Sequence, residues 1–164
     1  MIAGFVVLGA CSAGFGAALR TVTPRGSAGP WLVVAGGAAA IAAGAFRRDH
    51  MLLTGPGFAG ESWHNQVHDV ASAVAYAAML TAPLVLAWQF RADPQWAVIA
   101  RPVQVLALAS AATMAVFVSR VAEPYNGAVQ RTAVTLALAA EVLIAARMLW
   151  SGRRGRSRLL VAAR

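Results

Sequence analysis

The sequence predicts an all-α, polytopic transmembrane helical bundle of about five spans, and its composition and its long apolar runs carry that prediction. Hydrophobic residues make up 59% of the 164 residues and charged residues only 12%, about half the charged fraction usual in a soluble domain. The apolar runs approach the ~20 residues needed to cross a hydrocarbon core. Because backbone in lipid must satisfy its own hydrogen bonds, each run is expected to be a helix.

The spans are expected at about residues 1–19, 31–46, 64–90, 101–121 and 127–150, as one bundle over residues 1–150. The first ends at Arg20. The second is introduced by Pro30 and closed by Arg47 and Arg48, and it is dense in glycine and alanine. Small residues let helices approach closely in lipid, so this composition indicates packing within the bundle, with a homo-oligomer contact as the other possibility.

The later spans also carry boundary signals. Ser62 is expected to cap the third helix, and Pro102 suits the first turn of the fourth, where a missing N–H costs nothing. The fifth is followed by an Arg-rich tail over residues 151–164. The tryptophans all fall at or beside expected span ends, where indole favours the headgroup boundary; they are Trp31, Trp63, Trp88, Trp96 and Trp150.

Charge sets the expected orientation. All 14 basic residues are arginines and the formal net charge is +8, but the arginines sit at the ends of apolar runs, so no nucleic-acid partner is expected. With five spans, ten arginines fall on the C-terminal side, and four fall on the other side: Arg47, Arg48, Arg120 and Arg131. The positive-inside rule then makes the N-terminus external and the 151–164 tail cytoplasmic, in a bacterial inner membrane.

Polar residues gather on the expected outer side. The group comprises His50, His64, His68, Asp49, Glu61, Asp69 and Glu123. His64, His68, Ser72 and Tyr76 follow one another at a spacing of four residues, so they share one face of the third helix. Asp69 falls in an early turn of that helix, where the helix dipole favours an acidic side chain.

A second polar stripe is expected on the fifth helix. Gln130 and Glu141 are eleven residues apart, almost three full turns, and therefore share a face. Polar groups at membrane depth are costly and normally turn away from lipid. We therefore expect the two stripes to face each other across a cavity open to the outside.

Three interpretations of this cluster remain open. Acid–base chemistry needs a group that gives and accepts protons near neutral pH, and histidine does both. No cofactor is needed for that chemistry. The alternative is one divalent metal such as zinc, held by His64 and His68 at a helical spacing suited to ligands and completed by Glu61, Asp69 or Glu123. The third interpretation is that the charged residues pair only to tie the helix ends together.

Three short motifs resemble a bacterial membrane family known as domain of unknown function 998. Phe46-Arg47-Arg48-Asp49 is similar to its Phe-x-x-Asp exit from one helix, and Trp63 to Asp69 resembles its His-Gly-x-x-His entry to the next, with Asn65 in place of the glycine. Gly127 to Arg131 resembles its Gly-x-x-Gln-Arg start of the last helix. The resemblance covers nearly the whole chain. It implies that Asp49, His64, His68, Gln130 and Arg131 occupy motif positions, and that a sixth, first span of the family pattern is missing.

We expect an intramembrane acid–base enzyme of the isomerase, cyclase or hydrolase type, with membrane lipid around it and a lipidic, isoprenoid or polyketide-like substrate. His64 and His68 would act as acid and base, tuned by Asp69, Glu123 or Asp49. Substrate would be bound by Arg131, Gln130, Tyr76, Trp63 and Glu141. The alternative is a non-catalytic lipid-binding protein or an accessory subunit of a membrane complex.

Overall fold

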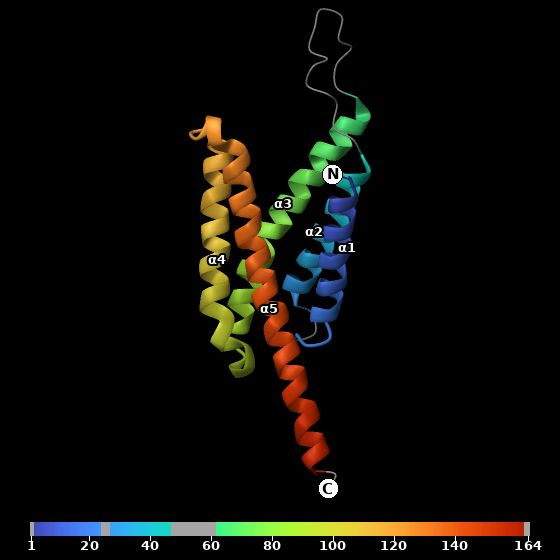
Figure 1. The fold of residues 1–164 in the computed structure, drawn as a ribbon, viewed down its shortest axis with the longest axis vertical. Helices are drawn as coiled ribbons and strands as arrows, with labels where there is room; N and C mark the ends of the chain where they lie inside the picture. The colour runs from blue at the N-terminus through green and yellow to red at the C-terminus, as the bar shows by residue number, and fades with distance from the viewer. Residues whose placement is uncertain (1, 24–26, 47–61, 163–164) are drawn as a thin grey trace, which may run out of the picture. The chain divides into compact units, whose positions relative to one another are not determined.

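The computed structural model describes residues 2–23, 27–46 and 62–162, with side chains from Ala3 to Ser151 within those ranges. The elements, in order, are α1 (Ile2–Leu19), α2 (Ala28–Ala45), α3 (Trp63–Phe90), α4 (Pro94–Ser119), the 3-10 helix η2 (Glu123–Tyr125) and α5 (Asn126–Ala162). The described ranges contain no strand, so the all-α prediction is confirmed (Figure 1).

Four helices are long and apolar enough to cross a membrane. These segments are Ala28–Ala45, Trp63–Phe90, Pro94–Ser119 and Glu123–Ser151, and Ala3–Leu19 is apolar but shorter. Large apolar side chains remain exposed on them, among them Val98 (71%), Val118 (71%) and Val142 (66%). Side chains of this kind gain more from lipid than from water, and the chain is a multi-pass membrane protein.

Two compact units divide the chain within α3, after Met79. In the first unit, α1 and α2 pack backbone against backbone through glycines. A Cβ added to Gly37 would lie 2.5 Å from the carbonyl oxygen of Gly9 and 2.6 Å from the nitrogen of Ala13. A Cβ added to Gly36 would lie 3.0 Å from that of Ala78 on α3. The small residues of α2 therefore pack inside the unit, as the sequence predicted.

The second unit contains the end of α3 together with α4 and α5. Figure 1 shows α4 and α5 running side by side from the turn at η2. Small and branched residues are buried on both helices, including Val103, Ala107, Ala137 and Ile144, each at most 1% exposed. The hydroxyl of Ser110 on α4 donates to the carbonyl oxygen of Ala133 on α5 at 2.7 Å, which places a polar link within this contact.

Helix α4 begins earlier than the apolar run suggested. Asp93 is its N-cap and accepts a hydrogen bond from the Gln95 nitrogen at 2.8 Å, and Pro94 holds the first position. The prediction that Pro102 lies in the first turn is wrong, because Pro102 lies inside the helix. Trp96 is buried at 5% exposure and stacks on Phe90, with ring centroids 4.7 Å apart. That stacking contact joins the first turn of α4 to the end of α3.

Helix α5 continues to Ala162, beyond the expected span end at residue 150. Its 37 residues correspond to about 55 Å of helix at 1.5 Å per residue, which exceeds the ~30 Å of a hydrocarbon core. The Arg-rich residues 151–162 therefore extend the helix past the membrane-spanning part. In Figure 1 this part of α5 runs on beyond the start of α4.

Candidate functional site

The first turn of α3 is capped as its sequence predicted. Ser62 precedes the helix, and its Oγ accepts a hydrogen bond from the backbone nitrogen of Asn65 at 3.2 Å, which satisfies one of the free N–H groups of a helix start. The Asn65 side chain is buried at 4% exposure, and its Nδ2 donates to Oδ2 of Asp69 at 3.2 Å. Asp69 is therefore held in a fixed position on its own helix.

An aromatic cluster joins the end of α2 to the start of α3. Phe46, the C-cap of α2, meets Trp63 edge-on at 5.7 Å and His64 at 6.0 Å between ring centroids. Trp63 and His64 are themselves perpendicular, 3.7 Å between centroids. His64 is exposed, as is Trp63 at 62%. The cluster therefore leaves the imidazole of His64 reachable while fixing the ring against two neighbours.

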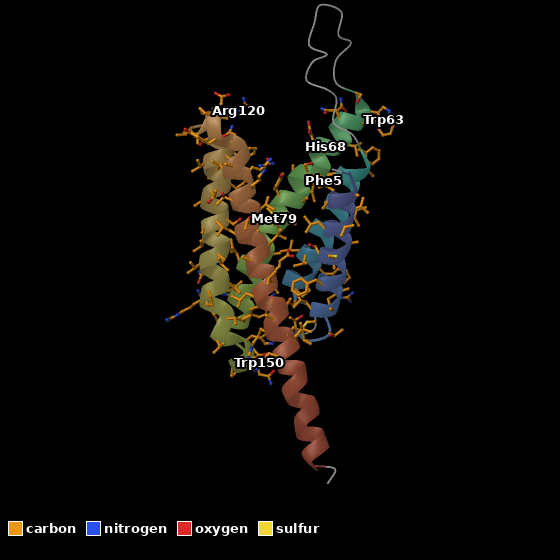
Figure 2. All side chains as sticks on the ribbon, in the orientation of Figure 1. Phe5, Trp63, His68, Met79, Arg120 and Trp150 are labelled. Carbon is orange, nitrogen blue, oxygen red and sulfur yellow. The ribbon has the colours of Figure 1, made fainter. Side chains whose placement is uncertain are left out.

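His68 lies on α3 beside the end of α2 (Figure 2). Its Nδ1 is 2.8 Å from the carbonyl oxygen of Ala43 and 3.0 Å from that of Phe46. A carbonyl oxygen can only accept a hydrogen bond, so Nδ1 must carry the proton and donate to both. In the neutral ring, Nε2 is then the nitrogen with the free lone pair.

This contact also satisfies carbonyl groups at the C-terminal end of α2. The last four carbonyls of a helix have no partner within the helix. The Ala42 carbonyl is taken by the Phe46 nitrogen at 3.1 Å, and the Ala43 carbonyl accepts from His68. Because the C-terminal end of a helix is electronegative, His68 fits there as a neutral donor or as a cation.

The predicted polar residues fall into both units. His64, His68, Asp69 and Tyr76 lie on the part of α3 in the first unit, where His68 and Tyr76 are half-buried. The other candidates belong to the second unit, with Glu123 and Arg131 exposed and with Gln130 and Glu141 half-buried. The cavity that these two groups are expected to share stays a prediction.

Three predicted residues, Asp49, His50 and Glu61, lie outside the described residues. Within the ranges that the structure describes, no group of three or more His, Cys, Asp or Glu side chains could hold a metal ion. A zinc site completed by Glu61 involves a residue outside the described ranges and therefore stays a prediction.

The structure adds participants that sequence reasoning missed, namely Asn65 and the main-chain carbonyls of Ala43 and Phe46. The Asn65–Asp69 pair has a visible signal, because residues four apart on a helix are neighbours. The contacts of His68 with the main-chain carbonyls have only an indirect signal in the sequence. Phe46 is the first residue of the Phe-x-x-Asp motif noted above. Every residue has a main-chain carbonyl, however, so the residue type does not reveal which carbonyl accepts a hydrogen bond.

Comparison with known proteins places the chain in one family. Neither the search of curated proteins nor the search of solved structures finds a match. The family model described as "Protein of unknown function (DUF998)" matches residues 1–161. Together with the helical membrane fold, that match shows that the chain belongs to the DUF998 family.

Proposed function

We propose that this protein is an intramembrane enzyme that moves a proton on a lipidic, isoprenoid or polyketide-like substrate, with His68 as the base. One observation carries the proposal: Nδ1 of His68 is committed to the carbonyls of Ala43 and Phe46. A ring held through one nitrogen has a fixed tautomer and a fixed direction for the other nitrogen, as a general base requires. Among the described residues, His68 makes no hydrogen bond through Nε2.

The neighbouring residues support the same chemistry. His64 lies one helical turn before His68, on the same face of α3, and its exposed ring can return a proton as general acid. The Asp69 carboxyl group, which accepts from Asn65, has a fixed position on the same turn of α3 as His68. In this proposal Nε2 of His68 takes the proton from the substrate, and His64 delivers one to a second position, as in an isomerase or cyclase.

The second candidate is a non-catalytic lipid-binding or accessory membrane protein. Both partners of His68 are main-chain carbonyls at the end of α2, and a residue that only caps a helix would make the same contacts. The two candidates differ in whether Nε2 is needed.

The matched pair His68→Asn and His68→Ala separates these candidates. The Nδ2 of asparagine can replace the Nδ1–H donor toward the two carbonyls, but asparagine has no counterpart of the basic Nε2. Bacterial cells expressing each variant are grown in deuterated water, and deuterium incorporation into the extracted apolar lipids is followed by mass spectrometry. Gln66→Ala, at an exposed neighbouring position of α3, is the control.

The enzyme proposal expects a lipid species whose deuterium label depends on the wild-type protein and on Gln66→Ala, and that is lost in both His68 variants. Label that persists in His68→Asn at a wild-type level of folded protein would contradict the role of Nε2. In that case the helix-capping, non-catalytic candidate is the better account.

We also propose that the chain lies in a bacterial inner membrane with its N-terminus outside. The support is the ten-to-four arginine asymmetry across the five expected spans. Single cysteines at Ala92 and Tyr125, which are exposed at opposite ends of α4, test it in a Cys11→Ser background. A membrane-impermeant thiol reagent added to whole cells should label the 125 position only; labelling of the 92 position alone would reverse the orientation.

A further inference from the structure

Two arginines, Arg91 and Arg101, lie near the turn from α3 to α4 in the second unit. Arg91 is the first residue after α3, and its Nη2 donates to Oε1 of Gln104 on α4. Arg101 precedes Gln104 by three residues on the same helix, and residues three apart are surface neighbours. Gln104 therefore brings Arg91 within about one helical turn of Arg101.

Arg101 interrupts a surface that is otherwise apolar. Val98, Val105 and Leu108 are 71%, 64% and 51% exposed, and with Arg101 they follow the spacing of three and four residues that forms one stripe of a helix. On a membrane-spanning helix such an exposed stripe faces lipid. A cation on that stripe is costly unless an anion accompanies it.

The described protein residues at this end do not supply that anion. The Asp93 carboxylate accepts from the Gln95 backbone nitrogen at 2.8 Å as the N-cap of α4. Neither Arg91 nor Arg101 forms an ion pair with an acidic residue in the described ranges. A third cation, Arg147 of α5, donates through Nε to the carbonyl oxygen of Gln95 at 2.8 Å. The local charge is therefore positive.

An exposed tryptophan lies close to Arg91, near the end of α3. Trp88 on α3 is 71% exposed and its carbonyl accepts from the Arg91 nitrogen at 3.3 Å. Indole rings concentrate at the boundary between hydrocarbon and headgroups. The cations next to Trp88 are thus at the depth where lipid phosphates lie.

We infer that Arg91, Arg101 and Gln104 bind the phosphate group of an anionic phospholipid. The planar guanidinium fork matches two phosphate oxygens. Gln104 holds Arg91 through its Oε1, so its amide N–H₂ stays available as a further donor. A net-negative headgroup such as phosphatidylglycerol neutralises the pair, whereas a zwitterionic phosphatidylcholine carries its own cation and does so less well. This site is separate from His68 and does not depend on the proposed function.

The test uses the full chain purified in detergent and native mass spectrometry with equimolar phosphatidylglycerol and phosphatidylcholine. The variants are Arg101→Gln and the Arg91→Gln/Arg101→Gln pair. The control is Arg120→Gln, which removes an exposed arginine at the other end of α4. Inorganic phosphate is added in a parallel series, to distinguish a lipid phosphate from a free one.

Wild type and Arg120→Gln should retain phosphatidylglycerol selectively. The double variant should bind it about 30-fold more weakly, and Arg101→Gln about 5-fold more weakly, from the known effect of each basic residue at a membrane surface. If the double variant does not fold, Arg101→Gln decides alone, because the Arg101 side chain makes no hydrogen bond within the described residues. Equal retention of both lipids, unchanged selectivity in the variants, or displacement by inorganic phosphate at equal concentration would each overturn the inference.

Discussion

Nδ1 of His68 donates to the carbonyl oxygen of Ala43 at 2.8 Å, and this bond links α3 to the last turn of α2. It gives one side chain two tasks, since the same bond that closes the end of α2 also sets the tautomer of the ring. The structural task uses Nδ1, and the chemical task that we propose uses Nε2. Substitutions can therefore separate the two.

Removal of the His68 donor should weaken the first unit. In His68→Ala the carbonyls of Ala43 and Phe46 lose their side-chain partner, and the free energy of unfolding should fall by about 1 kcal/mol, a typical value for a hydrogen bond between membrane helices. His68→Asn should recover part of this loss. Denaturant unfolding in detergent measures both. Equal loss in the two variants would show that the Nδ1 contact is not the stabilising one.

The close approach of α1 and α2 predicts a sharp contrast between two identical substitutions. In Gly37→Ala the new methyl group would overlap the Gly9 carbonyl oxygen at 2.5 Å, so the helices must separate, with a loss of about 1–3 kcal/mol in unfolding free energy. Gly14→Ala is the matched control, because a Cβ there has nothing within 4 Å. It should leave stability unchanged or slightly raised. Similar losses at both positions would contradict the packing of Gly9 against Gly37.

The link between α4 and α5 predicts a cost for losing one hydroxyl. Ser110→Ala leaves the Ala133 carbonyl without its 2.7 Å partner and should lower the unfolding free energy by about 1 kcal/mol. Thr113→Val provides the comparison, since the Thr113 hydroxyl donates only to Ala109 within its own helix. It should change stability little. A larger effect at Thr113 than at Ser110 would be inconsistent with the observed contact.

Arg120 ends α4 in a left-handed conformation, with φ of 55°, at the turn toward α5 (Figure 2). Side chains other than glycine are strained there, and glycine is the usual residue at such helix ends. Arg120→Gly should therefore raise the unfolding free energy by about 0.5–1 kcal/mol. Ser119→Gly, one residue earlier in the last turn of the helix, should lower it. Destabilisation by Arg120→Gly would mean that the guanidinium group has a tertiary role.

Local signals in the sequence were sufficient for the helices and for the Ser62 cap, because apolar runs and capping residues act over a few positions. The same signals failed at the start of α4. The apolar run predicts a helix that begins at Arg101, whereas the side chain of Asp93 and the fixed φ of Pro94 start the helix earlier. Trp96 shows a similar limit, since its position at a helix end was predictable but its burial against Phe90 was not.

The sequence predicts which residues belong to the candidate site, but it does not predict which atoms those residues contact. The spacing of His64 and His68 gives their shared face, but it does not reveal that His68 uses one nitrogen for the carbonyls of α2. Such a contact depends on where α2 ends beside α3, which is a tertiary relationship between two helices. The glycine and alanine content of the second span likewise predicts close packing without showing that Gly37 lies against Gly9.

The most direct test of the proposed role of His68 is a measurement of its tautomer. Nitrogen-15 NMR of histidine-labelled protein in detergent distinguishes a protonated from an unprotonated ring nitrogen, and the His68→Asn spectrum identifies the resonances that belong to this residue. The account predicts that, in the neutral ring, Nδ1 is protonated and Nε2 is not. A neutral His68 with its proton on Nε2 would contradict both the bond to the Ala43 carbonyl and the proposed base.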